Sequence, residues 1–287
     1  MGEVYVNDTL QDMRDYYNSN FNDFEFKKIL FIINVVTCII ISIGLPLTLV
    51  AIYALYSLVG KYNVAPIYVI NLLISDLIQF CCLIGLVAKS EDQKITVVIY
   101  FSSLLASVYF MVCIALERYL VIACPLWYRF RRSIKSSVVV CVLVWVFPLI
   151  FFIGYVFWYV PDFIMNITLF IFFLLPLPLL IFFLLGTLKA LSASILVTAD
   201  EKRRIVAMLV LLLLIYTLLS LPRIIMLLKK HDINDIPLHI LCDVFLKLSP
   251  LADLVLYVFM RKRAIDKLLA YVCCCRMDSN DVSSSTV

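Results

Sequence analysis

Seven ionisable side chains lie within long apolar stretches of the sequence: Asp76, Glu117, Arg118, Arg223, Asp243, Lys247 and Asp253. An ionisable group in such surroundings is costly unless it has a partner or a function, so these residues mark candidate sites for binding or switching. None of them is arranged like the paired carboxylates of a catalytic dyad. We therefore expect binding chemistry and no enzymatic activity.

The overall composition defines the setting of these residues. Of the 287 residues, 64% are hydrophobic and 15% are charged, against roughly 45–50% and 25% in an average soluble domain. This composition predicts a membrane protein and excludes a soluble enzyme. The two histidines, His231 and His239, are too few for a histidine-rich di-iron or haem centre. The net charge of +4 reflects loop bias and implies no nucleic-acid partner.

Seven charge-poor stretches are each long enough to cross a bilayer as a helix, which requires about 20 apolar residues. They lie at residues 28–61, 66–87, 95–116, 135–160, 164–188, 205–228 and 236–260. A membrane β-barrel would instead show alternating segments of about ten residues. The sequence therefore predicts an all-α membrane protein: a seven-transmembrane helix bundle with a short amphipathic C-terminal helix.

The distribution of Lys and Arg predicts the orientation. Most of the 24 Lys and Arg residues fall on the side that holds Arg118, Lys202 and Arg261, which we expect to be cytoplasmic. The predicted order is an extracellular tail at 1–28, the bundle at 29–260, an amphipathic helix at 261–275 and a disordered cytoplasmic tail at 276–287. Because residues 1–26 are acidic and polar, we expect the first span to act as the signal anchor.

Short patterns indicate two kinds of covalent modification. Asn7 begins a glycosylation sequon in the expected extracellular tail, whereas Asn166 begins one so near the membrane that we expect it to stay unmodified. Cys273, Cys274 and Cys275 follow the amphipathic stretch and are predicted to be palmitoylated. All ten cysteines lie in spans or on the inner side, so no extracellular disulfide is expected.

The triplet Glu117-Arg118-Tyr119 closes the third predicted span and is followed by Pro125-Leu126. The same pattern includes Asn71, Asp76, Trp145 and Pro222 at their places in the second, fourth and sixth spans. With seven helices, these residues resemble rhodopsin-like (class A) G-protein-coupled receptors, from the first span to Cys275. The stretch from Glu117 to Trp145 is similar to Mas-related receptors. Nucleotide, lysolipid and proton-sensing receptors share much of the pattern, so the subfamily stays open.

The resemblance implies roles at the cytoplasmic side. Arg118 would be held by Glu117 in a resting state and released in an active one, with Tyr119 completing the triplet. Leu126, after Pro125, would insert into a heterotrimeric G protein. The residues Lys202, Arg203 and Arg204 would form a basic docking face, although positive-inside bias alone explains them as well.

The resemblance also implies an allosteric sodium site. Asp76, Ser107, Ser249 and Asp253 match positions that surround a sodium ion in the family, with Asp76 as the first ligand of Na⁺. Two carboxylates in a medium of low dielectric constant need a cation or a shared proton, and we favour sodium. No other cofactor is expected.

Several departures from the family pattern affect the expected relay of the signal. Tyr257 matches the tyrosine of the helix-seven motif, but the motif proline is Leu254, and Pro250 is expected to kink that helix, as Pro222 does the sixth. Other family residues are replaced: Thr48 for the helix-one asparagine, Ser220 for the helix-six tryptophan, Leu184 for the helix-five tyrosine if Pro176 is the helix-five proline, and Gln93 for the helix-three cysteine.

The ligand pocket is expected between the third, fifth, sixth and seventh spans. Its candidate residues are Tyr100, Phe101, Arg223, His239, Asp243 and Lys247. Asp243 and Lys247 are four residues apart, so they either pair with each other or contact the ligand. Arg223 has no acidic residue four positions away, which favours an anionic small molecule or lipid as the ligand.

The sequence leaves other functions open. These are a receptor-like scaffold that no longer signals, a transporter, and an opsin, since Lys247 lies where opsins attach retinal. The serine-rich tail is expected to bind arrestin when phosphorylated, and its end, Ser285-Thr286-Val287, fits a PDZ groove. The expected location is the plasma membrane.

Overall fold

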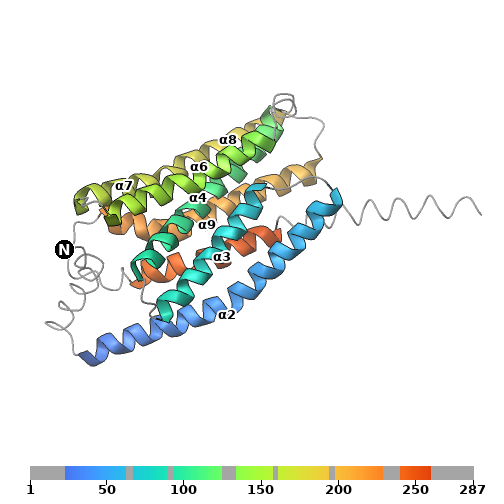
Figure 1. Ribbon diagram of the computed structural model, residues 1–287. Coiled ribbons are helices and arrows are strands. Elements are labelled where there is room, and N and C mark those ends of the chain that lie inside the picture. The colour runs from blue at the N-terminus through green and yellow to red at the C-terminus, as the bar shows by residue number, and fades with distance from the viewer. Residues whose placement is uncertain are drawn as a thin grey trace, which may run out of the picture.

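The structure is a computed structural model, and it describes residues 23–62, 67–88, 93–124, 134–157, 161–193, 198–228 and 240–259. These residues form helices and no strand (Figure 1). The labelled helices are α2 (Asp23–Tyr62), α3 (Ile67–Val87), α4 (Gln93–Ala123), α6 (Ile134–Phe157), α7 (Asp162–Leu174), α8 (Pro176–Ala193) and α9 (Ala199–Leu228). A further helical segment covers 240–259, which we call the last segment.

The helices run side by side along a common direction, and successive spans alternate in direction (Figure 1). Six stretches of the described chain are long and apolar enough to cross a membrane, and α7 with α8 supplies one of them. The last segment is not among the six, and it carries Asp243, Lys247 and Asp253 within 20 residues. With this segment as the seventh crossing, the predicted seven-helix bundle is confirmed.

The predicted span limits hold best for α3 and fail at two ends on the Arg118 side. The third span is predicted to close at residue 116, but α4 continues to Ala123. The sixth is predicted to begin at residue 205, but α9 begins at Ala199. Both extensions carry charged residues, which hydropathy excludes from a span but which a helix tolerates where it leaves the bilayer.

The fifth predicted span, residues 164–188, is divided in the structure. Leu175 separates α7 from α8, and its N–H still donates to the carbonyl of Ile171 at 2.9 Å. Pro176 begins α8 because proline has no N–H to donate and favours the first turn of a helix. The two helices therefore act as one crossing with a proline junction at its middle.

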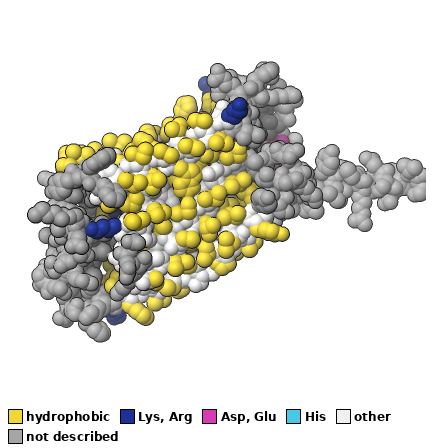
Figure 2. Space-filling view, viewed as in Figure 1, with side chains coloured by type: hydrophobic (Ala, Val, Ile, Leu, Met, Phe, Trp, Pro, Cys, Tyr) yellow, Lys and Arg dark blue, Asp and Glu magenta, His cyan; other side chains and the backbone are white. Residues whose placement is uncertain are grey.

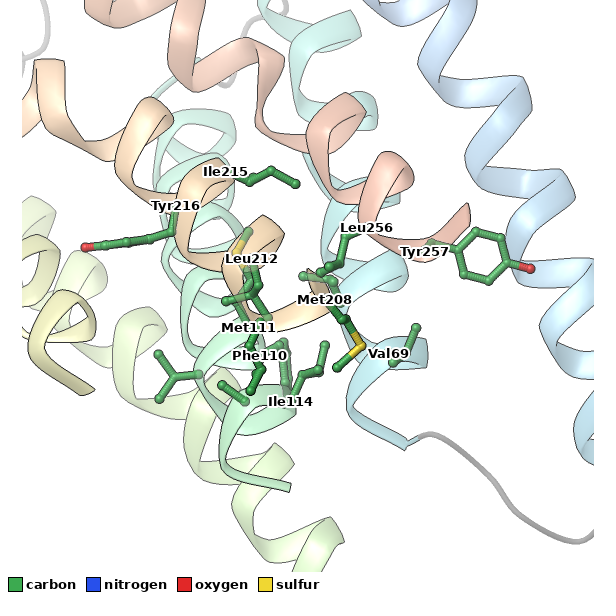
Figure 3. Packing of buried hydrophobic residues seen from close by; sticks show 14 of the residues in the cluster. Val69, Phe110, Met111, Ile114, Met208, Leu212, Ile215, Tyr216, Leu256 and Tyr257 are labelled. Carbon is green, nitrogen blue, oxygen red and sulfur yellow. The ribbon is translucent and has the colours of Figure 1, made fainter. Parts of the chain in front are cut away.

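The core lies between α3, α4, α9 and the last segment. Figure 3 shows Phe110, Met111 and Ile114 of α4 beside Met208 and Leu212 of α9 and Leu256 of the last segment. Figure 2 shows hydrophobic side chains over the sides of the bundle, with Lys and Arg near its two ends. Large exposed side chains such as Phe31, Tyr53 and Phe163 are the surface expected to face lipid.

Candidate functional site

Two buried carboxyl groups occupy the middle of the bundle. Asp76 of α3 and Asp253 of the last segment are both 0% exposed, and their carboxyl groups lie within hydrogen-bonding reach of each other. No donor from the described residues reaches any of their four oxygens. An uncompensated pair of carboxylates is unstable in such surroundings, so the arrangement fits a bound cation or a shared proton.

Two serines predicted for the same site are also buried. The Ser107 hydroxyl donates to the carbonyl of Leu104 at 2.9 Å, which leaves the lone pairs of its oxygen available. Ser249 is buried on the last segment. The described residues contain no group of three His, Cys, Asp or Glu that would hold a metal ion. The site therefore offers two carboxylates and hydroxyl oxygens, a donor set suited to a hard cation such as Na⁺ rather than to a transition metal.

The Glu117-Arg118-Tyr119 triplet lies one turn before the end of α4. The Tyr119 ring packs against the rings of Phe182 and Phe183 of α8, with centroids 6.0 and 5.8 Å away. A Cβ added at Gly186 would lie 2.6 Å from Cε2 of Tyr119, so glycine is what lets α8 approach this ring.

Arg118 is half-buried beside this contact, and its Nε has no hydrogen-bond partner among the described residues. Arg118 thus lies at the α4–α8 interface, on an element fixed by aromatic packing. Its predicted release from Glu117 stays a prediction.

The predicted basic residues lie at the same end of the bundle. Lys202, Arg203 and Arg204 are in the first turns of α9, which begins beside the end of α4 (Figure 1). Thr198 begins this helix: its hydroxyl accepts the N–H of Glu201 at 3.4 Å, and its carbonyl accepts that of Lys202 at 3.0 Å. The start of α9 is therefore fixed locally, and it presents its cations beside Arg118.

The predicted ligand residues lie toward the other end. Lys247 Nζ and Asp243 Oδ2 are 2.7 Å apart, so the pairing inferred from their spacing is confirmed. The Tyr100 ring is buried against Phe101, with centroids 5.4 Å apart, and its hydroxyl has no partner among the described residues. Asp243 acts electrostatically on Tyr100. These side chains therefore form one polar group at the interface of α4 and the last segment.

Arg223 differs from its prediction in one respect. Its Nη1 contacts Sδ of Met226 at 3.8 Å, and its Nε has no partner in the described part of the chain. The search of its own helix found no acid nearby, but the fold brings Asp243 close enough to interact with it electrostatically. Arg223 and Lys247 thus share the field of one carboxylate, which spacing along a single helix could not reveal.

Sequence reasoning named Asn71 and Trp145 only as marks of the family. In the structure, Nε1 of Trp145 donates to Oδ1 of Asn71 at 3.1 Å, and Nδ2 of Asn71 donates to the carbonyl of Ile67 at 2.9 Å. Tyr216 was missed altogether, although it is buried and its hydroxyl donates to the carbonyl of Phe173. Its signal was one phenol inside a long run of leucines.

Several predicted features lie outside the described residues. These are Pro125, Leu126, His239, the sequon at Asn7, Cys273, Cys274 and Cys275, the helix at 261–275, and both tails. The predicted kink prolines are described: Pro222 lies inside α9, and Pro250 is buried in the last segment, seven residues before the buried Tyr257.

Comparisons with known proteins agree with this geometry. The profile of the 7 transmembrane receptor (rhodopsin family) matches residues 47–257. The G-protein coupled receptor 68 of Mus musculus is 28% identical over 121 residues, which cover 39% of this chain and 33% of the relative.

Two further relatives are similar over comparable stretches. A purinoceptor of Xenopus laevis, purinoceptor 4, is 27% identical over 37% of this chain and 22% of its own length. The Mas-related G-protein coupled receptor member X1 of Homo sapiens is 29% identical over 41% and 38%. These matches span less than half of each relative, and their similar identities do not separate one subfamily from another. The profile covers more than half of the chain, from α2 to the last segment, and the chain belongs to the rhodopsin family of seven-transmembrane receptors.

Proposed function

We propose that this protein is a receptor that binds an extracellular ligand within the helix bundle and activates a heterotrimeric G protein. The observation that carries the proposal is the arrangement of the Arg118 end. Arg118 lies on α4, Tyr119 of the same turn packs on α8, and the cations Lys202, Arg203 and Arg204 begin α9 at the same end. A partner that docks there contacts three helices whose relative positions differ between two bundle packings.

The ligand site of this proposal is the polar group at the other end, formed by Tyr100, Arg223, Asp243 and Lys247. Two cations share one carboxylate there, so the group has a net positive charge. This favours an anionic small molecule or lipid, whose acidic group would pair with Arg223 while Tyr100 and Phe101 contact its apolar part. Asp76 and Asp253 would bind Na⁺ between the two ends, with a shared proton as the alternative.

The proposal includes the orientation and the modifications expected from the sequence. The N-terminus is extracellular at the plasma membrane, Asn7 is glycosylated, and Cys273, Cys274 and Cys275 are palmitoylated. Arrestin and a PDZ protein are proposed partners of the C-terminal tail.

The deciding experiment measures nucleotide exchange by each class of G protein in membranes containing the wild type or Arg118→Ala. We expect basal exchange, or exchange evoked by a panel of acidic lipids and metabolites, to fall at least tenfold in the variant at equal surface expression. Gly85→Ala is the matched control, because the added Cβ would meet only the Thr96 side chain, at 3.4 Å and beyond. Absence of exchange with every class would overturn the proposal in favour of a non-signalling scaffold.

A further inference from the structure

The proline junction between α7 and α8 leaves backbone acceptors without their usual donors. In a continuous helix the carbonyls of Phe172 and Leu174 would receive the N–H groups of residues 176 and 178. Both of these residues are proline, which has no N–H. The junction is therefore a weak point in the hydrogen bonding of this crossing, and it lies where α7 contacts α9.

A side chain from α9 reaches this junction. The hydroxyl of Tyr216 donates to the carbonyl of Phe173, which lies between the two affected carbonyls. Tyr216 is 1% exposed, and Figure 3 shows its hydroxyl pointing away from the cluster around Leu212 and Met208. Water therefore does not compete for this hydrogen bond, and the bond joins two helices 43 residues apart in the chain.

A small cavity lies directly beside Tyr216. It is lined by Tyr216, Ser220, Ser249 and Phe173, with apolar side chains around them, and it has about 10 Å³ of space for the centre of a water molecule. That volume holds about one water. Ser220 is one turn from Tyr216, within hydrogen-bonding reach of its phenol, and Ser249 belongs to the last segment. The cavity thus offers hydroxyl groups from two helices to one water.

We propose that Tyr216 is a positioning residue: it holds α9 against the α7–α8 junction in the resting receptor, and a water bound by Ser220 and Ser249 extends this link to the last segment. The inference rests on the proposed function, because it assigns a role in the same conformational change. Serine at position 220 gives the link its room, since a large aromatic side chain there would fill the cavity. A displacement of α9 must break the Tyr216–Phe173 bond and leave both groups buried without partners.

The test compares Tyr216→Phe with Tyr109→Phe. The first variant removes only the bonding hydroxyl, and the second removes that of a half-buried tyrosine in α4, which packs in the cluster of Leu104 and Phe152. Basal nucleotide exchange should rise about two- to tenfold in Tyr216→Phe, the range expected for one net hydrogen bond, and stay unchanged in Tyr109→Phe. A purely structural role would instead lower thermal stability without raising exchange, and that result would overturn the inference.

A second readout requires no G protein. Nitroxide labels on Cys124, which is exposed at the end of α4, and on an introduced Ala207→Cys on the exposed face of α9 report the distance between the two helices by electron–electron resonance. The other accessible cysteines are replaced by serine. Tyr216→Phe should add a population with a longer distance, and Ser220→Ala should add a smaller one.

The two readouts separate the failure of this inference from that of the proposed function. An unchanged distance distribution in Tyr216→Phe contradicts the positioning role even if the wild type signals. A longer distance without any nucleotide exchange supports the positioning role and counts against coupling to a G protein.

Discussion

The bundle contains two pairs of charged residues that meet opposite fates. Asp243 and Lys247 lie 2.7 Å apart and neutralise each other, near the end of the bundle. Asp76 and Asp253 lie at its centre, carry the same charge, and receive no hydrogen bond from the described residues. The last segment contributes to both pairs. The first pair is complete within the chain, whereas the second requires a cation or a proton from outside, so only the second is expected to respond to the ionic medium.

The largest effect is expected from breaking the complete pair, and it should be asymmetric. The Lys247 side chain is 15% exposed and the Asp243 side chain 48%. Asp243→Asn therefore leaves a buried ammonium without an opposite charge, which costs about 2–3 kcal/mol. Lys247→Met leaves a carboxylate that water still reaches and that also lies near Arg223, which costs about 1 kcal/mol or less. Thermal unfolding in detergent measures both, and equal losses would refute the assigned exposures.

A smaller effect is expected from the ionic medium at the central pair. A site with a dissociation constant of about 10 mM gains about 1.5 kcal/mol when Na⁺ rises to about 150 mM at constant ionic strength. The wild-type melting temperature should rise accordingly, and that of Asp76→Asn should not, because an amide replaces one of the two charges. Lys247→Met serves as the control and should keep the full response to Na⁺. A wild type that responds to pH but not to Na⁺ would indicate a shared proton instead.

The smallest effect concerns a neutral pair that serves as a reference for both. Trp145→Phe removes the donor to Asn71 Oδ1 but keeps an aromatic ring beside Phe110, whose centroid lies 5.9 Å from that of Trp145. The loss should be about 1 kcal/mol, the value of one net hydrogen bond, with no dependence on Na⁺. Thermal unfolding at low and high Na⁺ checks this, and a Na⁺-dependent loss would mean that the central site reaches further than Asp76 and Asp253.

Features that depend on spacing along one helix could be predicted from the sequence. The limits of α3 and the pairing of Asp243 with Lys247 follow from local hydropathy and from the four-residue helical repeat. The burial of Asp76 and Asp253 followed from the resemblance to a known family. These predictions needed no knowledge of which helices touch.

Features that depend on two helices could not be predicted in this way. The proximity of Arg223 to Asp243 joins α9 to the last segment, and the bond from Tyr216 to Phe173 joins α9 to α7. The division of the fifth crossing was missed because Pro176 and Pro178 are as apolar as their neighbours. Hydropathy therefore saw one continuous span, whereas the break depends on their missing N–H groups.

The charges of the last segment also bear on how the protein is made. Asp or Lys at the centre of a helix opposes insertion from the translocon by about 2.5–3.5 kcal/mol each, and this segment has Asp243, Lys247 and Asp253. The Asp243–Lys247 pair reduces this penalty, but Asp253 finds its polar surroundings only beside Asp76 of α3. The segment is therefore expected to insert stably only after α3 and α4 are in the bilayer, so assembly of the earlier helices, rather than hydropathy, completes the topology.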